Sequence, residues 1–270
     1  MPTQTEKGKR FRALHQGARA FIIPNPWDIG TARLLQSLGF EALATTSSGF
    51  AFSIGKHDGE VGLEAMLEHA AALAAACDLP VSADLENGYV DDPVGVAETV
   101  HRAAQVGLAG CSIEDVPQGG ERMPYELSLA AERVRAAAEA AHSHPFPFTL
   151  TARAENFVVG RPDLRDTIAR LQAFQEAGAD VLFAPGLRSK HDIASVVQSV
   201  ERPVNVLMGF EGATISVAEL SQIGVKRVSV GGALARAALG AVVRAAEEMR
   251  TKGTFTFVGH GVKSFSALAV

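Results

Sequence analysis

The 270-residue sequence predicts a (βα)8 TIM barrel, a closed ring of eight parallel strands surrounded by helices. Short apolar runs alternate with helical patterns along the chain, and the junctions between them repeat in pairs. Near-continuous apolar strands are typical of a parallel sheet that is covered on both faces. The expected strands are Ala20–Ile23, Ala42–Thr46, Val81–Leu85, Gly110–Ile113, Phe148–Ala152, Val181–Ala184, Val204–Met208 and Arg227–Val230.

Helical patterns rich in Ala, Leu, Glu and Arg separate these strands, as in Leu63–Ala76, Leu129–Ala141 and Ala233–Arg250. Glycine and proline alternate at the junctions that lead into the strands, so the strand-helix units repeat in pairs and indicate a barrel of four quarters. An apolar residue follows each glycine, as expected for a left-handed helix cap. The glycines are Gly39, Gly107, Gly178 and Gly224, and the prolines are Pro80, Pro147 and Pro203.

An open, doubly wound sheet is the alternative architecture for such a pattern. The first expected strand is not followed by the Gly-x-Gly-x-x-Gly turn that is typical of dinucleotide-binding sheets. We therefore expect one catalytic barrel domain over residues 1–250 and a C-terminal tail over residues 251–270.

The composition argues against several classes of function. The formal net charge is -5 without a block of like charge, which does not favour binding to nucleic acid. The apolar stretches are too short to span a bilayer, and the N-terminus lacks the apolar core of a secretion signal. Cys77 and Cys111 have the apolar surroundings of reduced core residues. We expect a cytoplasmic protein that contacts neither membrane nor nucleic acid.

Acidic side chains stand at the ends of two consecutive strands. Asp84 and Glu86 end the third strand, and alternation along a strand predicts that both point the same way. Glu114 ends the fourth strand, and the C-terminal ends of the strands carry the active site in barrels of this kind. Carboxylates without nearby His or Cys favour Mg²⁺, with Mn²⁺ possible, over Zn²⁺. The alternative interpretation is a set of salt-bridged or solvated acids at the loop entrances.

Other polar residues follow the remaining strands on the same face. Arg153 is suited to binding a carboxylate or phosphonate, or alternatively to structural pairing with Glu155 or Glu114. The tripeptide Ser47-Ser48-Gly49 could offer hydroxyl and N–H groups to an anion, although such a tripeptide is more often a turn. Asp58, on the glycine-rich loop 53–62, is either a lid residue or a solvated loop acid.

Five segments occur in order along the chain: PNPWD at 24–28, SSG at 47–49 with Asp58 after it, SADLENGY at 82–89, SIED at 112–115 and TAR at 151–153. Together they resemble the isocitrate lyase/phosphoenolpyruvate mutase superfamily over about residues 10 to 250. The resemblance implies an (α/β)8 barrel, Mg²⁺, and an α-keto acid or its enolate as the ligand. It also implies a homo-oligomer, a dimer or a tetramer, in which the eighth helix, here about Ala233–Arg250, is exchanged between subunits.

The resemblance also implies roles for individual residues. Asp84, Glu86 and Glu114 match the metal-site acids, with Glu86 where many members have Asp. The catalytic positions are Asp58, as the flexible-loop aspartate, together with Arg153 and Glu114. The substrate-binding positions are Trp27, Ser47, Ser48, Gly49, Asp84, Arg153 and Asn205.

Departures from the family pattern narrow the expected reaction. The loop after the fourth strand reads VPQGGER at 116–122 and lacks the Lys-(Lys/Arg)-Cys-Gly-His signature of isocitrate and methylisocitrate lyases. Val116 replaces the phosphonomutase lysine, and FAPG at 183–186 replaces the lyase Phe-Pro-Glu. The first hypothesis is therefore a Mg²⁺-dependent lyase acting on a small α-keto dicarboxylate, best exemplified by oxaloacetate decarboxylation. The alternatives are a phosphonomutase-type isomerase or hydrolase acting on phosphonopyruvate-like substrates, and a non-catalytic α-keto-acid binder.

Overall fold

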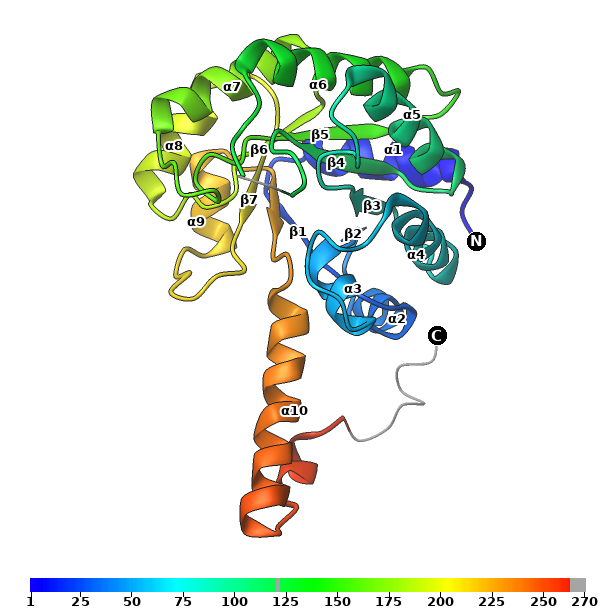
Figure 1. Ribbon diagram of the computed structural model, residues 1–270, viewed down its shortest axis with the longest axis vertical. Coiled ribbons are helices and arrows are strands. Elements are labelled where there is room, and N and C mark those ends of the chain that lie inside the picture. The colour runs from blue at the N-terminus through cyan, green and yellow to red at the C-terminus, as the bar shows by residue number, and fades with distance from the viewer. Residues whose placement is uncertain (120–121, 263–270) are drawn as a thin grey trace.

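The protein folds as a barrel of eight parallel strands, seen in a computed structural model that describes residues 1–119 and 122–262 (Figure 1). The strands pair in the order β1-β8-β7-β6-β5-β4-β3-β2. The amide of Ala44 donates to the carbonyl of Pro24 across the remaining gap, at 3.1 Å, so the ring is nearly closed. This confirms the (βα)8 TIM barrel. The strands are β1 (Phe21–Ile23), β2 (Leu43–Ala44), β3 (Val81–Asp84), β4 (Gly110–Glu114), β5 (Thr149–Arg153), β6 (Val181–Phe183), β7 (Val204–Leu207) and β8 (Arg227–Ser229).

Helices follow the strands and cover the outside of the barrel (Figure 1). The expected left-handed glycines are confirmed, with φ angles of 85° to 105° at all four positions. At Gly224 the amide donates to carbonyls of the last helical turn, which satisfies groups that a helix end leaves open. The helices are α1 (Gln4–Gln16), α2 (Ile29–Ser37), α3 (Ser47–Ser53), α4 (Leu63–Ala76), α5 (Pro93–Gln105), α6 (Leu127–His142), α7 (Leu164–Glu176), α8 (Lys190–Ser199), α9 (Val217–Ile223), α10 (Ala233–Lys252) and the 3-10 helix η1 (Thr256–His260).

Helix α1 packs across the N-terminal end of the barrel. Its Phe11 is fully buried, and the rings of Phe11, His15 and Phe21 meet edge to face. Gly110 makes this close approach possible, because a Cβ there would lie 3.1 Å from the Phe11 ring and 2.4 Å from the carbonyl oxygen of Thr149. Aromatic side chains therefore close this end of the barrel, and the opposite end remains available for polar side chains.

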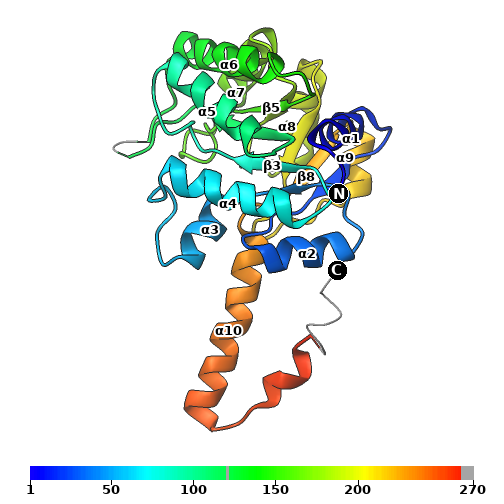
Figure 2. The ribbon, with the colours of Figure 1, turned by 90° about the vertical axis from the view of Figure 1, so that its right-hand side faces the viewer.

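Helix α10 leaves the barrel and projects away from it (Figure 1, Figure 2). Among its residues only Ala235 is buried, whereas Val242, Val243 and Met249 are exposed. An amphipathic helix gains most of its stability by packing an apolar face, which α10 does not do within this chain. Exchange of this helix between subunits remains a prediction. No helix in the described part of the chain is long and apolar enough to cross a membrane.

Candidate active site

A cavity of about 160 Å³ lies at the C-terminal ends of the strands. A second hollow of about 380 Å³ also contains Ser47, Asp58, Asp84 and Arg153 in its lining, so the two spaces adjoin. The structure thus brings together residues from segments that lie far apart in the sequence. Of the expected site residues, the first cavity is lined by Ser47, Ser48, Asp58, Asp84, Arg153 and Asn205, and the second adds Glu86 and Glu114.

Gly49 and Trp27 do not line either space. Gly49 lies in the first turn of α3, where its amide donates to the hydroxyl of Thr46 at 3.3 Å. That amide is therefore used by the helix cap. Trp27 packs beside Gly49, because a Cβ on Gly49 would lie 3.2 Å from the Cβ of Trp27. Both residues support the wall formed by α3, and their contact with substrate stays a prediction.

Arg153, at the end of β5, is surrounded by carboxylates. Its Nη1 lies 2.8 Å from Asp84 Oδ1, its Nη2 lies 3.1 Å from Glu114 Oε2, and its Nε lies 2.8 Å from Glu155 Oε1. The structural pairing with Glu155 and Glu114 that the sequence left open is therefore present. In this arrangement all three guanidinium nitrogens already have acidic partners.

Asp84 connects neighbouring strand ends. Its carboxylate accepts hydrogen bonds from the hydroxyls of Ser47 at 3.1 Å and Ser112 at 3.5 Å. Its backbone amide donates to Thr45 Oγ1 at 2.8 Å. With the Arg153 ion pair, these contacts tie the ends of β2, β3, β4 and β5 to a single carboxylate, which orients it within the cavity.

Glu86 reaches the site by a route that strand alternation did not predict. Strand β3 ends at Asp84, and Glu86 adopts a left-handed backbone conformation with φ 50°. Such a conformation is uncommon for residues other than glycine and is found frequently at functional sites. Gln118 Nε2 donates to one carboxylate oxygen of Glu86 at 2.5 Å, while the other, Oε1, is buried without a hydrogen-bond partner in the described residues.

Burial and mutual repulsion alter the protonation of these acids. The pKa of Glu86 is raised to about 7, first by burial and then by the negative charge of Asp84. Burial also raises the pKa of Glu114 well above its ordinary value, although Arg153 opposes the shift. The Asp58 residue is exposed overall, but its carboxyl group lines the cavity, and burial of that group raises its pKa.

The donor set fits a hard cation. In residues 1–119 and 122–262, no three acidic, His or Cys side chains converge as a preformed metal cluster, because Arg153 stands among the carboxylates. Even so, the acids that line the second space offer carboxylate oxygens as metal ligands. One of these oxygens, Glu86 Oε1, is buried without a hydrogen-bond partner in the described residues. Such ligands are those that Mg²⁺ prefers. Six acids line this space against the two cations Arg122 and Arg153: Asp58, Glu60, Asp84, Glu86, Glu114 and Glu155.

Sequence reasoning did not single out Arg227, which lines the first cavity from β8. The guanidinium of Arg227 donates through Nε to Asn205 Oδ1 at 3.0 Å, and the Asn205 amide donates to Ser229 Oγ at 3.0 Å. An arginine inside the barrel strand Arg227–Ser229 is the signal that could have identified it. Glu155, which the sequence offered only as a pairing partner of Arg153, is 1% exposed and bonded to that arginine.

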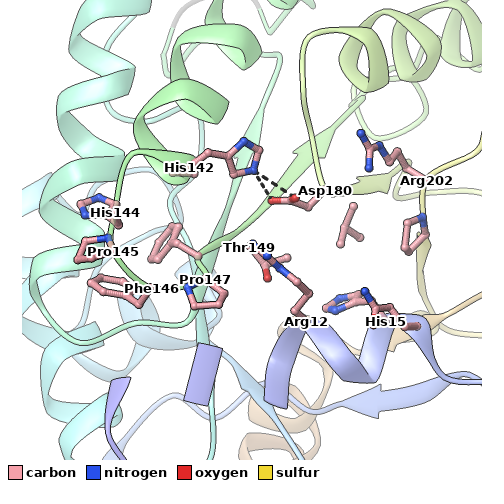
Figure 3. Close-up of a pocket in the computed structure, with 15 residues that line it drawn as sticks. Arg12, His15, His142, His144, Pro145, Phe146, Pro147, Thr149, Asp180 and Arg202 are labelled. Carbon is pink, nitrogen blue, oxygen red and sulfur yellow. Dashed lines mark hydrogen bonds and ion pairs between the residues drawn. The ribbon is translucent and has the colours of Figure 1, made fainter. Parts of the chain in front are cut away.

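A larger cavity of about 780 Å³ lies at the other end of the barrel, beside α1 (Figure 3). His142 and Asp180 form an ion pair there at 3.1 Å, which raises the pKa of His142. Asp180 also accepts a hydrogen bond from the amide of Leu150 at 2.9 Å, which anchors the start of β5. In barrels of this kind the active site lies at the C-terminal ends of the strands, whereas the N-terminal end serves stability. The acids of the C-terminal end therefore define the candidate active site.

Comparisons with known proteins show the family to which the chain belongs. The chain is 57% identical in sequence to a Burkholderia cenocepacia J2315 protein whose crystal structure is provisionally described as that of a lyase/mutase. The two structures superpose with a TM-score of 0.95 over 98% of this chain and 95% of that one. An uncharacterized protein of Mycobacterium tuberculosis H37Rv is 34% identical over 87% of both chains. An oxaloacetate decarboxylase of Pseudomonas savastanoi pv. phaseolicola is 27% identical over 93% of this chain and 88% of its own. The family model of phosphoenolpyruvate phosphomutase matches residues 11–250, and the chain belongs to this family, within the superfamily that its segments resemble.

Proposed function

We propose that this enzyme is a Mg²⁺-dependent carbon–carbon lyase acting on a small α-keto dicarboxylic acid, and that it decarboxylates oxaloacetate. The observation that carries the proposal is the group of strand-end carboxylates that surrounds a small cavity together with hydroxyl donors. Similarity to an oxaloacetate decarboxylase over most of both chains supports the choice of substrate. The absence of the lyase cysteine and histidine in loop 116–122 argues against isocitrate cleavage.

Asp84 would hold the metal, with Glu86 and Glu114 as further oxygen ligands, either directly or through water. When bound, Mg²⁺ supplies Lewis-acid stabilisation of the negative charge that an enolate carries. The hydroxyls of Ser47 and Ser48 line the same cavity and would orient the substrate carboxylate. Arg153 would contribute positive charge beside the substrate while holding Asp84 and Glu114 in position.

Asp58 is our candidate for moving a proton to the enolate. Its carboxyl group lines the cavity, and its raised pKa allows it to carry a proton closer to neutral pH than an ordinary aspartate does. It lies on the glycine-rich loop 53–62, so closure of that loop would also exclude water from the reacting carbon.

The direct test is incubation of the purified protein and Mg²⁺ with oxaloacetate, with product analysis against a metal-free control. Pyruvate and CO₂ above the spontaneous rate establish decarboxylation, whereas oxalate and acetate establish hydrolytic C–C cleavage. Asp84→Asn should abolish metal-dependent turnover while the fold is retained by circular dichroism. Glu132→Gln, on the exposed surface of α6, is the matched control and should retain full activity. Full activity in Asp84→Asn would refute the site assignment.

Two other functions remain candidates. Membership of the phosphoenolpyruvate phosphomutase family favours an isomerase or hydrolase acting on phosphonopyruvate-like substrates. Turnover of phosphonopyruvate without turnover of oxaloacetate would select it. The altered loop 116–122 is consistent with a non-catalytic α-keto-acid binder, which tight Mg²⁺-dependent binding without turnover would select.

We further propose that α10 packs against a second copy of this chain in a homo-oligomer. Val242 and Val243 are 63% and 54% exposed, and the helix buries almost nothing within its own chain. Val242→Glu combined with Val243→Glu should shift the mass measured by size-exclusion chromatography with light scattering towards the monomer. Arg244→Gln, an exposed polar change on the same helix, is the control. An unchanged mass in the valine double variant would contradict the proposal.

A further inference from the structure

Two guanidinium groups line the small cavity, and their partners differ. Arg153 contacts three carboxyl groups, so each of its guanidinium nitrogens already has an acidic partner. Arg227, on β8, is only 5% exposed and forms no ion pair within the described part of the chain. A buried cation without an anionic partner is strongly unfavourable, which makes Arg227 an unusual feature of the cavity.

The groups that do contact Arg227 are neutral. Its Nε donates to the amide oxygen of Asn205 at 3.0 Å, and its Nη1 lies 3.4 Å from Nε2 of His15. His15 Nδ1 is bonded to the carbonyl of Phe11 at 2.8 Å, so Nδ1 carries the proton and Nε2 is an acceptor. Burial, followed by the charge of Arg227, lowers the pKa of His15 to about 3, which keeps this ring uncharged.

The surroundings of Arg227 hold it in place and leave donors available. Asn205 is itself bonded to Ser229, and His15 packs edge to face against Phe11 and Phe21. His15 also lines the larger cavity at the N-terminal end of the barrel (Figure 3). Within residues 1–119 and 122–262, Nη2 of Arg227 has no hydrogen-bond acceptor. Burial lowers the pKa of Arg227 to about 9, so the group is still a cation at neutral pH.

We propose that Arg227 is the anion-binding residue at the floor of this cavity and that it binds the carboxylate which the substrate retains through the reaction. This inference rests on the proposed function for the identity of the substrate. The planar guanidinium fork suits a carboxylate, and the incoming anion supplies the charge that the protein does not. Asn205 and His15 are then positioning residues that orient the fork.

The chemistry of decarboxylation determines which carboxylate Arg227 takes. In this reaction the C–C bond to one carboxylate breaks, its electron pair passes to the enolate, and the carboxylate leaves as neutral CO₂. An ion pair with that group would stabilise the substrate and be lost in the transition state, which slows the reaction. The partner of Arg227 is therefore the carboxylate next to the keto group. Pyruvate and oxalate carry the equivalent group.

The test compares ligand binding in variants of Arg227 and its neighbours in the presence of Mg²⁺. Arg227→Met should weaken binding of pyruvate and of oxalate, measured by calorimetry, by about 30-fold or more. Asn205→Asp keeps the arginine but sets a carboxylate against its Nε, and we expect a similar loss. Lys226→Met, which removes a neighbouring cation bonded to the carbonyl of Gly17, is the control and should bind both ligands as the wild type does.

The outcomes separate this inference from the proposed function. Wild-type binding that depends on Arg227 without oxaloacetate turnover supports the anion site and refutes the decarboxylase. Unchanged pyruvate and oxalate binding in Asn205→Asp or in folded Arg227→Met refutes the inference, as does a wild type that binds neither ligand. A loss confined to oxaloacetate, with pyruvate binding intact, would place Arg227 at the leaving carboxylate and also refute it. If Arg227→Met does not fold, Asn205→Asp decides the question.

Discussion

Replacing Arg153 by methionine tests whether the centre of the site is a buried electrostatic network. The change removes the guanidinium that lies 2.8 Å from Asp84, 3.1 Å from Glu114 and 2.8 Å from Glu155. Methionine retains much of the apolar stem but loses the contact of the guanidinium with the Phe183 ring, 5.2 Å from its centroid. The main loss is the cation that neutralises carboxylates in a poorly hydrated space.

The expected cost follows from how deeply these acids are buried. Glu114 is 8% exposed and Glu155 is 1% exposed, so water cannot replace the lost partner. Removing one member of a buried ion pair costs about 3–5 kcal/mol, a large part of a total stability of about 5–15 kcal/mol. For a domain of this size each kcal/mol lowers Tm by about 2–4 °C, so Arg153→Met should lose about 6–20 °C.

The pH dependence of this loss has a definite sign. Burial raises the pKa of Glu114 well above its ordinary value, and Arg153 is the group that opposes the shift. Without Arg153 the folded variant binds this proton more readily than the wild type, and protonation removes the uncompensated charge. The difference in free energy of unfolding between wild type and variant should therefore shrink as the pH falls through the raised pKa of Glu114.

Thermal and urea unfolding, followed by circular dichroism in EDTA, measure these differences. Arg102→Met is the matched control because it breaks an exposed ion pair with Glu64, which solvent screens. Arg102→Met should leave Tm nearly unchanged. Equal losses in the two variants, or a loss in Arg153→Met that grows at lower pH, would refute the reasoning.

Two further predictions concern single residues. In metal-free protein the pKa of Glu86 is raised to about 7 from an ordinary 4.5. Its contribution to the free energy of unfolding therefore falls as the pH rises between these two values. Glu86→Gln should remove this pH dependence from the midpoints of urea unfolding. Gly110→Ala would put a Cβ 2.4 Å from the Thr149 carbonyl oxygen and should cost about 1–3 kcal/mol or more by urea unfolding, whereas Gly30→Ala, in the exposed helix α2, should be stabilising by about 0.5–1 kcal/mol. A Gly110 variant as stable as the Gly30 variant would contradict the packing that we describe between α1 and the barrel.

The order and type of the elements could be predicted from local sequence. Each expected strand overlaps an observed strand, with ends that agree within about two residues, and the helix over Leu63–Ala76 has the predicted bounds. The left-handed φ angles at the four junction glycines were predictable because a helix end requires the same local geometry wherever it occurs. The parallel barrel follows from this alternation, because each element buries the apolar face of the next.

The sequence also indicated where the chemistry lies, since Asp84, Glu114 and Arg153 each end a strand on the same face. It could not indicate how these groups pair, because pairing depends on contacts between strands that are remote along the chain. Glu86 shows the difference: its position beside Asp84 was expected from alternation, but a left-handed backbone conformation brings it there.

By itself, the sequence determined the barrel, its junctions and the acidic end that carries the site, because periodicity and turn chemistry act over a few neighbouring residues. The tertiary structure alone decided that Arg153 is enclosed by three carboxylates and that Arg227 is buried against neutral partners. The physical reason is that charge interactions and pKa values depend on distance in space and on exclusion of water, and neither quantity is a property of local sequence.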